Sequence, residues 1–364
     1  MYLTEQHLIK QNNNLFKECD NLCLKSKNLY NSCLYIIRQA YIKDKTNLIF
    51  NLHHLMKETT QYRDLPAKVS SHVLLMVQQN FKSYFKTTAE YYKNPSKFKS
   101  RPKLPSYLDT NGGRFIISYT NQALSKKVFK KTGKIKLSLS NIEINTRIKD
   151  FNSLDCVRII PRNNYYVIEV VYTIIEKEKL KDNNNYLSLD IGVNNLATLT
   201  SNVISPLIIN GKPLKSMNQF YNKKMAETKS ILEKRNNKKS SKRINNLNLK
   251  RKNKIDNYLH KSSKEIIKIC KNNKINTIII GKNDGWKQNV SMAKRSNQNF
   301  VNIPHSRFVE MIKYKCEIEG INIIIQEESY TSKASFLDLD FIPIYGKEPL
   351  IFNFSGKRIK TWII

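Results

Sequence analysis

The chain has 364 residues, enough for two or three domains that each bury a core. It carries 63 Lys and Arg against 29 Asp and Glu, a formal net charge of +34, which predicts a polyanionic partner. We find no signal peptide, no apolar run long enough to cross a bilayer and no cationic amphipathic helix at either end, so nucleic acid is expected rather than an anionic membrane. The six cysteines include no C-x-x-C pair and indicate reduced thiols, with Cys19 and Cys23 spaced for packing on one helix face.

The N-terminal part of the chain is predicted to be helical. Apolar residues at helical spacing indicate one helix from Leu3 to about Lys43, and Pro66 opens a second that runs to about Lys93. Tyr84, Tyr91 and Tyr92 on the second helix either continue its apolar face or stack on nucleotides; the first role is favoured.

Residues 94–105 contain three prolines and form a basic extended segment. A solvated linker is the simplest interpretation, but the alternating cations also suit a phosphate backbone; these are Lys97, Lys99, Arg101 and Lys103.

The following stretch has the period of strands. Short β-branched or aromatic runs at 115–119, 135–139, 142–144, 157–160 and 165–172 predict a small antiparallel sheet or barrel.

The segment from Tyr186 to Asn202 is the most informative in the sequence. An apolar strand ends on Asp190, a turn containing Gly192 follows, and a second strand begins. An Asp-x-Gly turn alone is often only a turn. At the end of a strand, however, it also places a carboxylate where a metal ion or phosphate can approach.

A long basic helical stretch, about 217–271, comes next. Its thin apolar seam predicts a helical hairpin laid along a nucleic-acid backbone rather than a solvated face alone. The candidate contacts are Lys234, Arg235, Lys238, Lys239, Lys242, Arg243, Lys250 and Arg251. A strand at 275–280, a helix at 304–319 and a strand at 321–325 then indicate a mixed α/β layer fold.

Three segments carry a family resemblance: Leu189–Thr198, Gly281–Gln288 and Glu327–Ser335. In this order they resemble the TnpB (OrfB) proteins of bacterial insertion sequences, relatives of type V CRISPR effectors. The resemblance implies an α+β multidomain protein with a helical recognition lobe (1–95), a β-barrel wedge domain (96–178) and a RuvC/RNase H-like nuclease domain (182–364) with a helical insertion at about 213–272. It also implies a cytoplasmic RNA-guided DNA endonuclease whose partners are a guide RNA from the transposon end and double-stranded target DNA.

Two-metal hydrolysis with Mg²⁺ is the chemistry that the resemblance implies, and it needs converging carboxylates. Asp190 matches the first. Many relatives carry Glu where this chain has Gly281, so the second carboxylate is expected from the end of the following strand. Glu328 is preferred to Glu327 because its spacing to the Tyr-Thr-Ser-Lys segment resembles the family pattern. The acid nearest to Gly281 in the sequence is Asp284, in the following loop. An exposed acid pair at a strand end is the alternative.

Two departures from the family pattern bear on activity. The positions of its C-x-x-C zinc ribbon hold Ser335 and Asp338, so no structural zinc is expected. The resemblance also implies a third catalytic Asp near the C-terminus, and none is expected in this sequence, which stops at Ile364. Asp338 and Asp340 lie too early to match it, and a truncated reading frame is expected. A nuclease-deficient RNA-guided binding protein is therefore the second hypothesis. An actin-like or sugar-kinase-like ATPase is disfavoured by the ten glycines and the charge.

Overall fold

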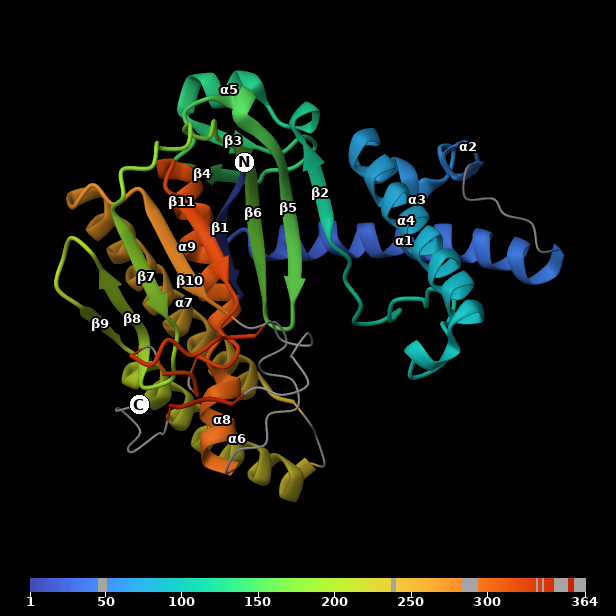
Figure 1. Cartoon of the computed structure of the whole chain (residues 1–364). Coiled ribbons are helices and arrows are strands. Elements are labelled where there is room, and N and C mark those ends of the chain that lie inside the picture. The colour runs from blue at the N-terminus through green and yellow to red at the C-terminus, as the bar shows by residue number, and fades with distance from the viewer. Residues whose placement is uncertain are drawn as a thin grey trace. The chain divides into compact units, whose positions relative to one another are not determined.

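The computed structural model describes residues 1–44, 51–236, 240–282, 294–331, 333–335, 337–343 and 353–356. The chain divides into two compact units, Met1–Ile174 and Ile175–Ile364 (Figure 1). Each combines helices with a sheet, so the predicted mixed α/β character is confirmed.

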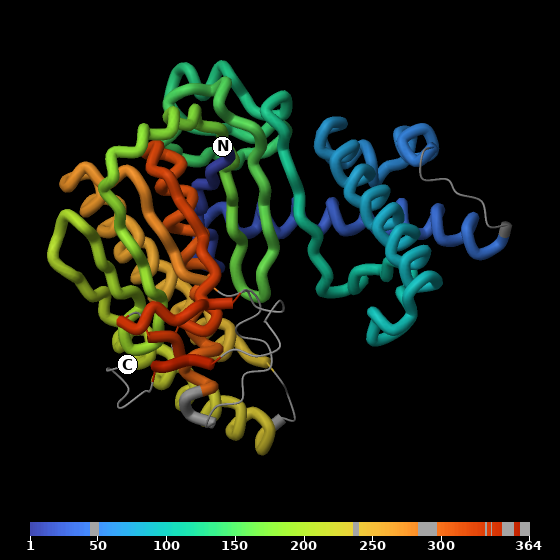
Figure 2. The backbone as a smooth tube through the Cα atoms, in the orientation of Figure 1, coloured from blue at the N-terminus to red at the C-terminus, as the bar shows by residue number. Residues whose placement is uncertain are grey.

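The first unit is built on a four-stranded antiparallel sheet in the order β1-β6-β5-β2. Its strands are β1 (Tyr2–Lys10), β2 (Ile117–Thr120), β5 (Leu154–Arg162) and β6 (Tyr165–Thr173). The predicted helix from Leu3 is therefore wrong over its first residues: β1 pairs with β6 along its whole length, from Tyr2 opposite Thr173 to Lys10 opposite Tyr165 (Figure 2). This long-range pairing overrides local helical spacing.

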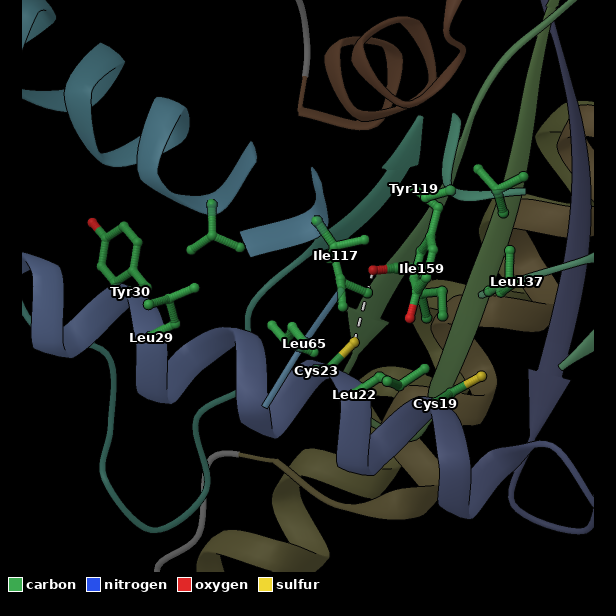
Figure 3. Packing of buried hydrophobic residues seen from close by; sticks show 14 of the residues in the cluster. Cys19, Leu22, Cys23, Leu29, Tyr30, Leu65, Ile117, Tyr119, Leu137 and Ile159 are labelled. Carbon is green, nitrogen blue, oxygen red and sulfur yellow. Dashed lines mark hydrogen bonds between the residues drawn. The ribbon is translucent and has the colours of Figure 1, made fainter. Parts of the chain in front are cut away.

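Two long helices, α1 (Phe16–Asp44) and α4 (Ala67–Lys93), pack with this sheet in one hydrophobic core. Figure 3 shows the α1 face that carries Cys19, Leu22 and Cys23 turned toward Ile117 and Ile159 of the strands. The Cys23 Sγ lies 3.8 Å from the Ile159 carbonyl oxygen, and both Cys19 and Cys23 are fully buried. Their predicted packing role is confirmed.

Shorter elements complete the first unit. They are α2 (Leu52–Met56), α3 (Thr60–Arg63), η2 (Pro95–Lys97), η3 (Asn121–Ala123), α5 (Lys126–Thr132), η4 (Phe151–Ser153), and the two-stranded sheet β3 (Lys134–Lys136) and β4 (Glu143–Asn145). The predicted antiparallel strands are confirmed, but strand pairing over the described residues does not close a barrel. Helices and strands share the core of this unit, and the division at residue 95 stays a prediction.

The second unit is built on a mixed five-stranded sheet in the order β11-β10-β7-β8-β9. The strands are β7 (Tyr186–Asp190), β8 (Asn195–Ser201), β9 (Leu207–Asn210), β10 (Thr277–Gly281) and β11 (Asn322–Gln326). The β7, β10 and β11 strands are parallel neighbours, whereas β8 and β9 extend the sheet antiparallel. The β10 strand therefore has β7 on one side and β11 on the other.

The helices of this unit are α6 (Lys212–Asn236), α7 (Lys242–Asn272), α8 (Lys294–Asn302) and α9 (His305–Glu319). The predicted basic hairpin is α6 and α7, which contact each other, and the Ser241 hydroxyl caps α7 by accepting from the Ile244 N–H at 3.3 Å. The buried sides of α7 and α9 share a core with the sheet. Among the described helices none has the length and apolarity needed to cross a membrane.

Candidate active site

The carboxyl ends of three parallel strands meet at one edge of the second sheet (Figure 1). Asp190 is the last residue of β7, Gly281 the last of β10, and Gln326 the last of β11, with Gly281 opposite Gln326. Leu187 and Leu189 are buried while Ser188 and Asp190 are exposed. Because side chains alternate along a strand, Asp190 faces away from the core and is free to act at the edge.

The Glu328 carboxyl occupies the space beside Gly281. A Cβ added to Gly281 would lie 1.5 Å from Glu328 Oε1 and 1.8 Å from its Cδ. No side chain at position 281 is compatible with this arrangement. Two residues after β11, Glu328 therefore delivers a carboxylate to the end of β10, which supplies none of its own.

Electrostatics couple Glu328 to Asp190. The pKa of Glu328 is raised above its ordinary value, first by burial and second by the negative charge of Asp190. A raised pKa with a like-charged neighbour is typical of carboxylates gathered for a cation or for proton transfer, because bringing them together costs free energy that a bound cation offsets. The structure thus brings these two predicted residues together at one sheet edge, and their role as metal ligands stays a prediction.

Glu327 is placed differently. It is exposed, and its Oε1 accepts a hydrogen bond from the Ser329 hydroxyl at 2.5 Å. The preference for Glu328 over Glu327 agrees with this geometry.

The turn beyond Asp190 is fixed by residues that sequence reasoning missed. His305, fully buried at the first position of α9, has its Nε2 3.1 Å from the Gly192 carbonyl oxygen. The Gly211 N–H donates to the Asn194 carbonyl at 2.7 Å, and a Cβ on Gly211 would lie 2.3 Å from the Val193 carbonyl oxygen. The only sequence signals are a glycine and a histidine at helix starts, and neither identifies its partner.

Two carboxylates among the described residues could ligate a metal ion at this edge of the sheet. Asp190 and Glu328 supply the hard oxygen donors that Mg²⁺ prefers. No group of three or more His, Cys, Asp or Glu that could hold a metal ion occurs in the part of the chain that the structure describes. Asp284 lies outside that part.

Asp338 and Asp340 bind the segment 353–356 instead. Asp340 accepts from the Ser355 N–H at 2.8 Å and from its hydroxyl at 2.7 Å, and Asp338 accepts from the same hydroxyl at 3.1 Å. A hydrogen bond from the Ser335 N–H, followed by those from Ser355, holds the pKa of Asp340 below its ordinary value. Both carboxylates therefore accept hydrogen bonds that join this turn to the segment 353–356.

The predicted basic segment lies exposed after α4. Lys97, Lys99, Arg101 and Lys103 are all exposed. Lys97 pairs with Glu90 at 3.2 Å, and Arg101 donates to the Tyr92 hydroxyl at 2.8 Å and lies over its ring. Tyr92 is 63% exposed, whereas Tyr84 and Tyr91 are half-buried. Tyr92 with Arg101 therefore forms a surface suited to stacking.

The basic hairpin contains two kinds of cation. The first kind is exposed to solvent and comprises Lys234, Arg235, Lys242, Arg243 and Lys250. Arg251, by contrast, is half-buried; it donates to Asn218 Oδ1 at 2.7 Å and to the Asn302 carbonyl at 3.3 Å, and lies over the Tyr221 ring. Lys238 and Lys239 lie outside the described residues.

One part of the chain matches a known protein family. Residues 168–287 match the OrfB_IS605 family, described as "Probable transposase". The resemblance to OrfB proteins is confirmed. The match spans the Asp190 strand pair and the basic hairpin, and it ends within the segment that begins at Gly281.

Solved structures similar to the chain include two Cas12f complexes. "Cryo-EM structure of the Cas12f1-sgRNA-target DNA complex" matches at 16% identity with a TM-score of 0.48, covering 88% of this chain and 75% of that chain. "Cryo-EM structure of CRISPR-Cas12f Ternary Complex" matches at 17% identity with a TM-score of 0.32, covering 88% and 73%. No curated protein matches the chain.

Proposed function

We propose that the protein is an RNA-guided DNA endonuclease of the TnpB type, with Asp190 and Glu328 as metal ligands of its active site. The observation that carries the proposal is the seating of the Glu328 carboxyl over Gly281, coupled electrostatically to Asp190 at the end of the neighbouring strand. The OrfB match and the net charge of +34 support nucleic acid as the substrate.

In the proposed mechanism the protein supplies fixed oxygen donors at a sheet edge. Asp190 is positioned by β7 and by the turn after it, which His305 and Gly211 contact through hydrogen bonds. The Glu328 carboxyl lies in the space that the missing side chain of Gly281 leaves open. Bound Mg²⁺ would stabilise the charge developing on the phosphate and lower the pKa of a coordinated water. Both carboxylates must be ionised to hold the cation, so the like-charge cost at this edge is offset only when the site is loaded.

Exposed cations are proposed to hold the nucleic-acid backbones. Lys234, Arg235, Lys242, Arg243 and Lys250 of the hairpin, and the exposed cations of 97–103, face solvent and contact phosphates regardless of sequence. We assign Arg251 a smaller share, since its guanidinium is engaged within the protein.

A concavity in the first unit is proposed to read the target duplex. It has a volume of about 470 Å³ and lies between α4, the β2–η3 segment and the start of β5, with Lys68, Asn121, Gln122 and Asp155 exposed among its lining residues. Lys, Asn and Gln are the side chains that pair with guanine and adenine edges in the major groove. Replacing Asn121 and Gln122 by Ala should relax the preference for one short duplex motif in a randomised-target cleavage assay; an unchanged preference would remove this role.

Cleavage by the guide-loaded protein tests the main proposal. The protein is co-expressed with the DNA that flanks its reading frame, the bound RNA is sequenced, and a plasmid matching that RNA is supplied with Mg²⁺. We expect cleavage that disappears in Asp190→Ala and in Glu328→Gln. Cleavage retained by Asp190→Ala would refute the assignment.

A nuclease-deficient RNA-guided binding protein is the second candidate. It is favoured by the site itself, where the described residues bring together two carboxylates rather than the three that the family resemblance implies. Guide-dependent binding of the matched plasmid, without cleavage at any Mg²⁺ concentration, would establish it.

A further inference from the structure

A cavity of about 750 Å³ in the first unit lies outside the site described above. Two segments enclose it: helix α5 with the glycine that follows, and the chain from Thr146 to Asn152. Its lining residues are Lys126, Phe129, Lys130, Gly133, Thr146, Arg147, Ile148, Lys149, Asp150, Phe151 and Asn152. We call it the α5 cavity.

The α5 cavity is strongly cationic. Lys126, Lys130, Arg147 and Lys149 line it and are exposed, and none of them forms an ion pair with a carboxylate in the described ranges. The lining carboxylate, Asp150, accepts a hydrogen bond from the Asn152 N–H at 2.9 Å, within its own turn. The positive potential is therefore left for a ligand, and a concave wall strengthens it.

Aromatic rings form part of its wall. Phe129 is buried and Phe151 is half-buried, and their rings meet edge to face with centroids 5.4 Å apart. Gly133 ends α5 with a positive φ of 69°, and a Cβ there would meet no atom within 4 Å. The glycine thus caps the helix and leaves open space where it lines the cavity.

The second segment is held in place before any ligand arrives. Glu5 Oε2 on β1 accepts from the Thr146 hydroxyl at 2.8 Å and from the Arg147 N–H at 3.2 Å. The Ile148 N–H then donates to the Thr146 hydroxyl at 3.2 Å. Fixing the backbone in this way lowers the ordering cost of binding at Arg147.

We propose that the α5 cavity binds an unpaired nucleotide of a single-stranded nucleic acid. Its cations contact the flanking phosphates, and the half-buried ring of Phe151 stacks on the base. A base within a duplex has both faces covered by its neighbours, so a stacking site inside a cavity selects an unstacked nucleotide. The inference rests on the proposed function only in taking nucleic acid as partner, and it does not depend on cleavage.

Binding of short labelled oligonucleotides in EDTA tests the inference without the nuclease site. The probes are fluorescent oligo(U), fluorescent oligo(dT) of equal length and a blunt duplex. A Lys130→Gln, Arg147→Gln pair removes two cavity cations. Its matched control is Lys127→Gln with Lys131→Gln, which also removes two positive charges, from exposed positions of α5 that do not line the cavity.

We expect the cavity pair to weaken oligonucleotide binding at least about fivefold more than the control pair, with a smaller effect on the duplex. Phe151→Leu, which keeps an apolar side chain but removes the ring, should weaken the same probes at least about fivefold. A larger loss with oligo(U) than with oligo(dT) identifies RNA as the source of the nucleotide, and the reverse identifies DNA.

Equal losses from the two pairs, or wild-type affinity in Phe151→Leu, would overturn the proposal. Photo-crosslinking of 4-thiouridine-containing oligo(U) to the wild-type protein gives an independent readout should a variant fail to fold. The crosslink is expected on residues 126–133 or 146–152, and crosslinks only elsewhere would also overturn it. Loss of DNA cleavage in Asp190→Ala leaves these outcomes unaffected, so the two proposals fail separately.

Discussion

Gly281 shows how a single missing side chain shapes the candidate site. Glu328 reaches the end of β10 only because position 281 has no Cβ, which would lie 1.5 Å from the Glu328 carboxylate. Gly281→Ala should therefore displace this carboxylate and slow cleavage by about a hundredfold, the scale expected for an active-site group moved by about 1 Å. Glu327→Gln, one residue away, is the control and should cleave normally. Wild-type cleavage by Gly281→Ala would show that Glu328 is not a ligand.

The pKa of Glu328 predicts how stability depends on pH. Burial and the Asp190 charge raise this pKa above 4.5 in the folded protein, so the folded state binds the proton more tightly than the unfolded state. Stability therefore falls as pH rises from the unfolded-state pKa through the folded-state pKa. Glu328→Gln should have the higher melting temperature at neutral pH without metal, an advantage that shrinks as the pH falls through the folded-state pKa and is lost by pH 4.5.

Thermal unfolding in EDTA across this pH range measures the effect. Glu327→Gln is again the control, with no pH-dependent difference from wild type expected. If Glu328→Gln melts lower than wild type at neutral pH, the carboxylate makes stabilising contacts that outweigh its electrostatic cost.

The pairing of Asp190 with Glu328 could be predicted from the sequence because carboxyl ends of parallel strands lie at the same edge of a sheet. Leu187 and Leu189 mark a strand that ends on Asp190, and parallel strands bring Glu328 to the same edge. Sequence alone could not show that Glu328 fills the space at Gly281, or that His305 contacts Gly192, because both contacts join segments that are distant along the chain.

At the scale of elements, helices with a local apolar pattern were predicted well, whereas elements that depend on distant partners were not. The helices α4 and α9 carry apolar stripes and were predicted close to their observed bounds, whereas for α1 and α7 only the C-terminal ends were predicted correctly. The β1 strand was predicted as helix because its nine residues are stabilised by β6, more than a hundred and fifty residues later, and not by their own spacing. The seven-residue helix α5 has too few turns to show a period.

The two kinds of cation on α7 predict opposite effects of substitution. Arg251 joins α7 to Asn218 of α6 and to the Asn302 carbonyl of α8. Arg251→Gln should lower the free energy of unfolding by about 1–3 kcal/mol, since Asn218 is buried and loses a charged partner. Lys250→Gln, at the adjacent exposed position, should leave stability unchanged and weaken nucleic-acid binding. Chemical denaturation and binding assays on both variants decide this, and equal stabilities would contradict the internal role of Arg251.

For the whole molecule, the dominant quantity is the net charge of +34, which is spread over cations from both units. Self-repulsion of this size opposes the compact state until a polyanion neutralises it. Nucleic-acid binding should therefore stabilise the entire chain, and cations held for internal contacts, such as Arg251, contribute less to this than the exposed ones.

The salt dependence of binding measures how many phosphates the molecule neutralises. Each phosphate contact contributes about −0.9 to the slope of log K against log salt for a duplex and about −0.7 for a single strand. If the exposed cations of 97–103 and of the α6–α7 hairpin together make six or more contacts, affinity should fall by about a thousandfold between low and physiological salt. Replacing Lys234, Arg235, Lys242 and Arg243 by Gln should make the slope shallower for unrelated sequences alike, because phosphate contacts carry no base information. A nearly flat salt dependence in the wild type would show that these helices do not hold the backbone, and a loss confined to one sequence would assign them to base reading instead.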